Sequence, residues 1–285
     1  MLTLLLAAAL QAAPAAMPPP PKPWDPIAAD WVAIPDDEVM IMVLADGRRV
    51  VIRLAPRLAP VHVANIRALI AARWWDGESV YRVQENWVAQ WGDATEKKPL
   101  PATVVRTPAA EFEIGPFAPA ARMTRSDGYS VASGFTADGW PIATDGKVAW
   151  LTHCYGSVGV ARDALPDTGT GSELFTPIGQ SARRLDRNYT VVGRVIEGMA
   201  NMSSLPRSEA PMGVYATAAE RTAIATIRLA SELPAAARPR YQYRATGNAR
   251  FAAYIKSREA PETSTVPTGA AVCDLATGVR RKPAE

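Results

Sequence analysis

The turn Asp46-Gly47 constrains the fold of this chain more than any other short segment. It joins two apolar runs, residues 38–45 and 48–55. Asp-Gly between strand-like segments is a strong signal for a hairpin, because both turn residues accept a positive φ. The folded part of the chain is therefore expected to begin with two antiparallel strands.

The rest of the chain is predicted to add mostly strands and two helices. Apolar residues recur at helical spacing after Pro60, which predicts a helix over 60–73, and a short helix is expected at 199–205. Strands are expected at 79–83, 87–91, 157–161, 173–178, 189–196 and 223–230, and at 241–244, which is expected to pair with 223–230. The predicted fold class is mainly β, a closed antiparallel barrel capped by two helices.

The N-terminal segment is typical of an exported protein. An apolar run, Leu2–Leu10, is followed by small residues up to Ala16. We interpret residues 1–16 as a signal peptide and 17–37 as a proline-rich linker, which predicts a periplasmic or secreted protein. The run is shorter than the roughly 20 residues of a membrane span, so no stable membrane insertion is expected. The alternatives are a misassigned start codon, a disordered Ala/Pro tail or a cytoplasmic protein.

Two further segments lie outside the regular pattern. Residues 94–155 are interpreted as a long insertion with short strands near 111–114 and 148–151, and residues 208–285 as a C-terminal extension. Cys154 and Cys273 are the only cysteines of the chain. In an exported protein they can form one disulfide, or both can be free thiols, and the sequence does not decide between these states.

Charge and ligand spacing exclude two classes of function. The net charge is +3, with Lys and Arg dispersed among acidic residues, so nucleic acid is not an expected partner. No His or Cys spacing is typical of a zinc site. His153 and Cys154 are adjacent and would point to opposite faces of a strand, which argues against a nucleophilic pair. His153 is expected to make a structural hydrogen bond, and His62 is expected to be solvated on the polar side of its helix.

Five sequence blocks, taken in order, resemble the cyclophilin family of peptidyl-prolyl cis–trans isomerases. They are APRLAPVHVANIRALI (55–70), VYRVQENWVAQWGD (80–93), GSVGVARD (156–163), TGSELFTPIG (170–179) and LDRNYTVVGRVIEGM (185–199). The resemblance implies a cyclophilin-like barrel over residues 38–207. It also implies that the chain isomerises X–Pro bonds without a metal or cofactor, and that its partners are proline-containing polypeptides.

The resemblance assigns roles to individual residues. Arg82 corresponds to the catalytic arginine of the family and Gln90 to its polar partner. The corresponding substrate-binding residues are Trp87, Val88, Ala161, Arg162, Glu173, Phe175, Leu185 and Tyr189. A fixed guanidinium can donate to the prolyl nitrogen as the amide twists, and an apolar pocket excludes water from that bond. Without the other blocks, local sequence favours a structural role for Arg82, as an arginine that snorkels from its strand or pairs with Glu173 or Asp93.

Two functions follow from this pattern. The first is an isomerase that acts on X–Pro bonds of exported or envelope proteins. The second is a proline-binding chaperone or scaffold with weak or no activity, since Glu173 replaces a glutamine of the family and Trp87 a phenylalanine. An ion pair between Glu173 and Arg82 would favour the scaffold, and a guanidinium free of it would favour the enzyme. The sequence sets no oligomeric state.

Overall fold

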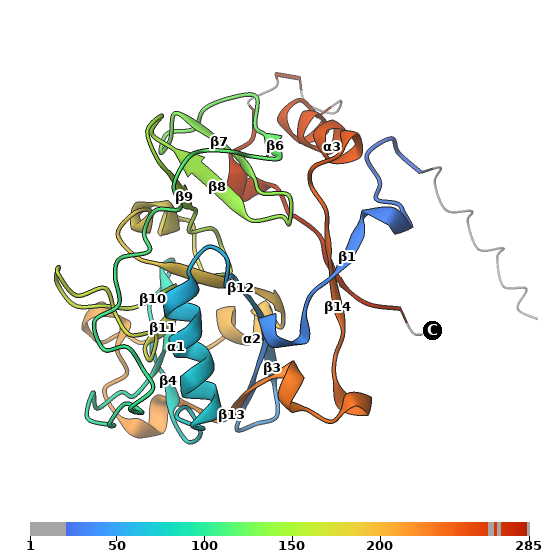
Figure 1. The fold of residues 1–285 in the computed structure, drawn as a ribbon. Coiled ribbons are helices and arrows are strands. Elements are labelled where there is room, and N and C mark those ends of the chain that lie inside the picture. Colours follow the sequence, from blue (N-terminus) through green and yellow to red (C-terminus); the bar gives the residue numbers. More distant parts are fainter. Residues whose placement is uncertain (1–20, 262–264, 267–268, 284–285) are drawn as a thin grey trace, which may run out of the picture.

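A closed antiparallel β-barrel forms the centre of the molecule (Figure 1). The computed structural model describes residues 21–261, 265–266 and 269–283. The barrel strands are β2 (Val39–Leu44), β3 (Arg49–Leu54), β4 (Ser79–Val83), β5 (Val88–Gly92), β10 (Ser157–Val160), β11 (Leu174–Pro177), β12 (Val191–Glu197) and β13 (Thr222–Leu229). Around the barrel they follow the order β10-β11-β5-β4-β13-β2-β3-β12, and β12 pairs with β10 to close it. The predicted fold class is confirmed.

The predicted hairpin joins β2 and β3. Gly47 has φ +86°, a conformation that glycine adopts without steric cost, and Met42 lies opposite Val50 in the register. Alternate residues of both strands, including Met40 and Ile52, are fully buried in the barrel core. The alternation places one face of the hairpin in the core, which fixes its register.

Two helices pack against the barrel, as expected, and a third lies elsewhere. Helix α1 (Pro60–Ala71) buries Ile66 and its neighbours in the barrel core, and helix α2 (Met199–Ser203) buries Met202 there. Helix α3 (Ala249–Glu259) was not predicted. Short 3-10 helices connect the elements: η1 (Ala28–Asp30), η2 (Asp36–Glu38), η3 (Ser181–Leu185), η4 (Pro211–Gly213), η5 (Ala218–Glu220), η6 (Ala230–Glu232), η7 (Ala235–Ala237) and η8 (Val272–Asp274).

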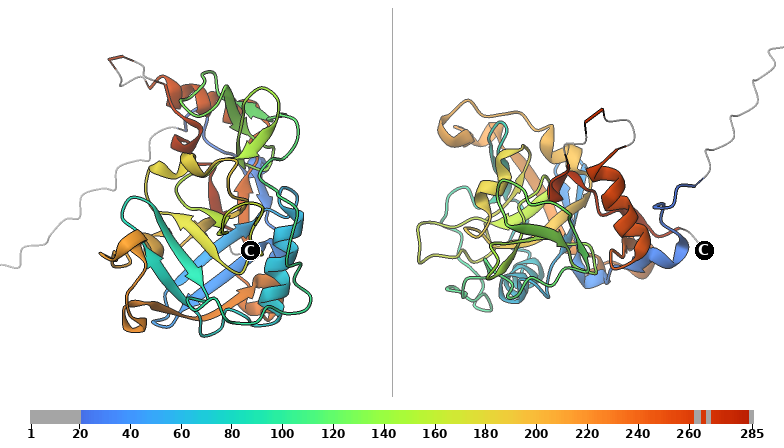
Figure 2. Two further views of the ribbon diagram at one scale, coloured as in Figure 1. Left: turned by 90° about the vertical axis from the view of Figure 1, so that its left-hand side faces the viewer. Right: turned by 90° about the horizontal axis from the view of Figure 1, so that it is seen from above.

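The insertion and the C-terminal extension build a second core above the barrel (Figure 2). The insertion forms a sheet of β6 (Ala121–Arg122), β7 (Ala132–Phe135), β8 (Pro141–Thr144) and β9 (Ala149–Leu151). Phe135 of this sheet meets Phe251 of α3 edge to face, with ring centroids 5.3 Å apart. The strand predicted at 148–151 is present as β9. The strand predicted at 111–114 is wrong, because these residues form no strand and only the next residue, Gly115, makes an isolated bridge, to Ala149.

Strand β13 belongs to the barrel although it follows residue 207. It pairs with β4 on one side and β2 on the other. The segment that the sequence interpretation assigned wholly to an extension therefore supplies one strand of the barrel. The proposed boundary after residue 207 would leave β2 and β4 without this partner.

A three-stranded sheet ties the N-terminal segment to the extension. It contains β1 (Trp31–Ala33), β14 (Tyr241–Arg244) and β15 (Val279–Arg281), with β14 in the centre. The predicted pairing of residues 241–244 with 223–230 is wrong. Residues 31–33 are a paired strand rather than linker, held beside buried Asp30, which accepts bonds of 2.7 and 2.6 Å from Arg250.

Cys154 and Cys273 form a disulfide, which resolves the alternative that the sequence left open. It links the segment before β10 to the C-terminal extension across 119 residues. The predicted signal peptide lies outside the described residues. Among those that are described, no helix combines the length and apolar character needed to cross a membrane.

Candidate active site

Arg82 lies on β4, directly opposite Gln90 on β5. Its Nη1 donates to Gln90 Oε1 (3.1 Å), its Nη2 to Gln84 Oε1 (2.7 Å) and its Nε to the carbonyl of Met212 (2.7 Å). All three acceptors are neutral. A guanidinium has five N–H groups, so this arrangement fixes its plane and leaves two N–H groups that no described residue accepts from.

The carbonyl that receives Arg82 Nε comes from a distant turn. Met212 and Gly213, in η4, have φ of +60° and +75°. A Cβ at Gly213 would lie 2.6 Å from the Cβ of Gln84, so only glycine fits against β4. The close approach places the Met212 carbonyl at Arg82. No local sequence pattern indicated this contact, because the turn follows Arg82 by 130 residues.

Gln90 is oriented by two partners. Its Oε1 accepts from Arg82 and its Nε2 donates to the hydroxyl of Tyr81 at 2.5 Å. Burial raises the pKa of Tyr81 above its usual value, so the phenol is neutral at physiological pH. The amide of Gln90 consequently presents its oxygen to the guanidinium. Tyr81 was not among the predicted site residues.

Glu173 does not pair with Arg82. Its Oε1 accepts from the backbone N–H of Asp93 at 2.7 Å, and its Oε2 is buried without a hydrogen-bond partner among the described residues. Burial raises the pKa of Glu173 to about 7, against the opposing effects of the Tyr81 hydroxyl and the Asp93 amide. The Asp93 carboxylate accepts instead from Thr95 and from the amides of Lys97 and Lys98. The structural ion pairs considered for Arg82 are therefore wrong.

An apolar cluster lies beside the hydrogen-bonded side chains of Tyr81, Arg82 and Gln90, which we call the polar row. The structure packs Val88, Phe175, Leu185, Trp87, Ala161 and Tyr189 together. Phe175 lies opposite Gln90 in the pairing of β11 with β5, which joins the cluster to the polar row. Side chains from four separate segments of the chain thus form one apolar cluster next to the polar residues.

Arg162 is fixed at the edge of this cluster. Its Nε donates to the carbonyl of Asn188 (2.7 Å) and its guanidinium lies 4.7 Å from the ring centroid of Tyr189. A polar cavity of about 460 Å³ adjoins this edge and is lined by Gln90, Arg162, Glu173 and insertion residues such as Arg106. A separate cavity of about 510 Å³, between β12 and residues 272–279, contains none of the predicted site residues.

Both histidines are buried, so the prediction of a solvated His62 is wrong. The insertion covers this face of α1, and His62 Nδ1 lies 2.6 Å from Glu111 Oε2. His153 has the expected hydrogen bond, with its Nδ1 3.3 Å from Asp186 Oδ1. Across the part of the chain that the structure describes, no group of His, Cys, Asp or Glu is arranged to hold a metal ion.

Comparisons with known proteins agree on one family. The model of the family described as "Cyclophilin type peptidyl-prolyl cis-trans isomerase/CLD" matches residues 39–227, from β2 into β13. Two proteins named "Probable peptidyl-prolyl cis-trans isomerase", from Brucella suis and Brucella abortus, are 28% and 27% identical over 181 residues, 62% of this chain and 76% of theirs. The crystal structure of the cyclophilin AquaCyp293 from Hirschia baltica superposes with a TM-score of 0.67 at 24% identity, over 90% of this chain and 94% of that one, which shows a shared fold.

Proposed function

This chain belongs to the cyclophilin-type peptidyl-prolyl cis–trans isomerase family and has that activity, and we propose that Arg82 is its catalytic group. Rotation about the peptide bond faces a barrier of about 18–20 kcal/mol, because resonance gives the C–N bond double-bond character. As an X–Pro bond twists, the prolyl nitrogen regains its lone pair. An N–H of Arg82 that donates to this nitrogen stabilises the twisted state more than either planar state.

One observation carries this proposal. The guanidinium of Arg82 is held by three neutral acceptors and keeps two N–H groups free of them. Its charge is therefore not neutralised by a carboxylate, and its plane is fixed before a substrate binds. Catalysis that depends on charge stabilisation is most effective when the donor is oriented in advance.

The apolar cluster supplies the second part of the mechanism. Phe175 and Leu185 would receive the proline ring, and Trp87 and Tyr189 would flank it. An occupied pocket excludes water, which strengthens the hydrogen bond from Arg82. No covalent bond is made or broken, so the reaction requires neither a nucleophile nor a cofactor.

The scaffold hypothesis lacks the observation that would favour it. An ion pair between Glu173 and Arg82 would favour it, whereas Glu173 accepts from the Asp93 amide. The substrates we propose are X–Pro bonds in exported or envelope polypeptides. The Cys154–Cys273 disulfide supports this location, since such bonds persist in oxidising compartments. The mass of the mature protein recovered from the periplasmic fraction of its source cell tests export, and an uncleaved cytoplasmic chain would contradict it.

The decisive experiment measures cis-to-trans exchange of a short X–Pro peptide by NMR, with wild type and Arg82→Ala. We expect clear acceleration by wild type and a loss of about 100-fold or more in kcat for the variant, the size of effect seen when one transition-state donor is removed. Peptide binding by both proteins with no difference in exchange rate would reject Arg82 as the catalytic group.

A further inference from the structure

The ring of Phe175 is confined on three sides. The imidazole of His153 lies parallel to it, with an interplanar angle of 9° and centroids 5.9 Å apart. Tyr189 meets it edge to face at 5.6 Å. On β10, directly opposite Phe175, Gly159 leaves room for the ring, because a Cβ there would lie 2.3 Å from Phe175 Cζ. The orientation of this ring therefore depends on where His153 stands.

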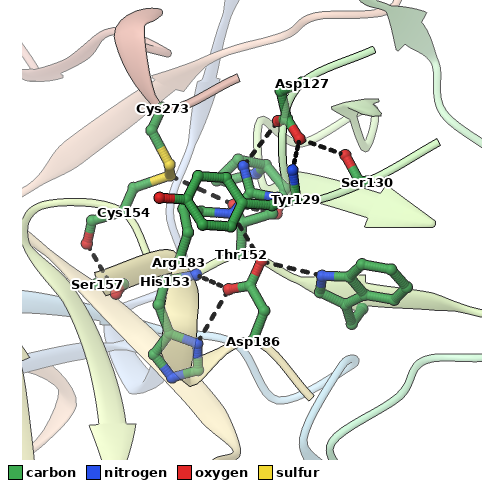
Figure 3. A network of polar contacts seen from close by, with 12 residues as sticks. Asp127, Tyr129, Ser130, Thr152, His153, Cys154, Ser157, Arg183, Asp186 and Cys273 are labelled. Carbon is green, nitrogen blue, oxygen red and sulfur yellow. Dashed lines mark hydrogen bonds and ion pairs between the residues drawn. A yellow bond between two sulfur atoms is a disulfide. The ribbon is translucent and has the colours of Figure 1, made fainter. Parts of the chain in front are cut away.

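His153 is itself held rigidly. Its side chain is fully buried, and both its backbone N–H (2.8 Å) and its Nδ1 (3.3 Å) contact Oδ1 of Asp186 (Figure 3). The other oxygen of Asp186 accepts from Trp150 Nε1 (3.1 Å) and Arg183 Nε (2.6 Å). Burial alone would raise the pKa of Asp186, but the bond from His153 and the charge of Arg183 lower it, so the carboxylate is ionised.

This network lies directly behind two walls of the apolar cluster. Asp186 follows Leu185 in the chain, and His153 lies behind Phe175. The network reaches into the insertion, where Arg183 Nη1 donates to Asp127 Oδ2 at 2.8 Å. Cys154, next to His153, is bonded to Cys273 of the C-terminal extension (Figure 3). Segments outside the barrel therefore hold the back of a surface that the barrel presents.

We propose that His153 is a positioning residue for the isomerase, and that its imidazole plane fixes the ring of Phe175 against which substrate proline binds. The inference rests on the proposed function of the apolar cluster. A proline ring contacts Phe175 in the planar and in the twisted states alike. Displacement of Phe175 therefore weakens both equally, which raises KM and leaves kcat nearly unchanged.

The test compares three substitutions at His153 with one at His62. His153→Asn keeps a hydrogen-bonding group and removes the aromatic ring, His153→Leu fills the space without an aromatic ring, and His153→Phe restores one. His62→Asn is the matched control, because His62 is also buried and bonded to a carboxylate, that of Glu111, but does not contact Phe175. Thermal unfolding of each protein is recorded first, and kinetics are measured well below the lowest midpoint.

We expect His153→Asn and His153→Leu to raise KM for an X–Pro peptide about tenfold, with kcat within twofold of wild type. His153→Phe should return KM to within about threefold of wild type, and His62→Asn should leave KM unchanged. Unchanged KM in the folded Asn or Leu variant would overturn the proposal, as would an equal rise in the His62 control or no rescue by Phe. If the His153→Asn variant does not fold, the KM values of the His153→Leu and His153→Phe variants decide between the two outcomes.

The same assay separates this inference from the proposed function. Failure of wild type to accelerate exchange would reject the function itself. Acceleration by wild type that Arg82→Ala abolishes, together with normal KM in the His153 variants, would reject only the positioning role.

Discussion

The two ends of the candidate site are held in different ways. Arg82 is half-buried and is fixed by hydrogen bonds to neutral acceptors, two from glutamines on its own hairpin and one from the Met212 carbonyl. Phe175 is buried and is backed by His153 and the ionised Asp186, which belong to a network anchored in the insertion. Arg82 must donate to a substrate whose geometry changes, so it keeps its charge and two N–H groups outside these hydrogen bonds. Phe175 must present a fixed apolar surface, so it is packed against buried residues on the side away from the substrate.

Removal of the disulfide tests how far the Phe175 side of the candidate site depends on the C-terminal extension. Replacing Cys154 and Cys273 together by serine should lower the free energy of unfolding by about 5 kcal/mol, because the bond closes a loop of 119 residues. Urea denaturation with and without reductant measures this. Reductant should reproduce the loss in wild type and have no effect on the double variant.

The KM and kcat of the double variant show which side of the site, that of Phe175 or that of Arg82, the extension supports. Since the disulfide adjoins His153 and not Arg82, we expect KM to rise and kcat to change less than twofold under folding conditions. A selective loss of kcat would show that the extension supports the Arg82 end instead.

Glu173 tests whether the polar row depends on pH. Its pKa is raised to about 7 in the folded protein from 4.5, so the folded state holds the proton more tightly than the unfolded chain. The resulting stability is fully present below pH 4.5 and is lost as the pH rises through about 7. Wild type should therefore be less stable at pH 8 than at pH 5 by about 2 kcal/mol from this group.

Glu173→Gln should remove that difference, because the amide does not titrate. Chemical denaturation of both proteins at pH 5 and pH 8 measures it, and parallel pH dependences would contradict the assignment. Arg82 is charged at both pH values. A step in activity near pH 7 that disappears in the Gln variant would consequently belong to Glu173.

Gln84 gives the smallest expected effect. Gln84→Ala removes one of three acceptors from Arg82 and leaves Gln90 and the Met212 carbonyl in place. We expect kcat to fall about threefold to tenfold, the equivalent of about 1 kcal/mol for a hydrogen bond of this kind. KM should stay constant in the exchange assay. A fall as large as that of Arg82→Ala would mean that Gln84 alone orients the guanidinium.

The sequence predicted those parts of the site that depend on near neighbours. Arg82 and Gln90 face each other across two strands that were both predicted from local pattern, although the roles of the two residues came from the family resemblance. The positions of the eight barrel strands also followed, because apolar runs between turn signals identify strands locally, whereas β1, β6, β7, β8 and β15 were not predicted. The cluster around Phe175 was reached only through a family resemblance, since nothing in the spacing of Val88 and Leu185 requires that they meet.

Contacts between distant segments were missed for a physical reason. The partner of a strand is chosen by packing and not by its own residues, so β14 was given the wrong neighbour and β13 was left outside the barrel. His62 was expected in solvent because its helix position is polar. The insertion buries His62 through Glu111. Its sequence has no pattern that predicts which part of the barrel domain it packs against.

The central position of β14 between β1 and β15 has a consequence for biosynthesis. Trp31 pairs with Arg244, and Tyr241 pairs with Arg281. A chain made from its N-terminus exposes β1, and β2 as well, long before β14 and β13 have been translated. Unpaired strand edges invite association with other chains. The three-stranded sheet of this isomerase can therefore form completely only after residues 279–281 are available, and until β14 and β13 are present the edges of β1 and β2 are open to association with other chains.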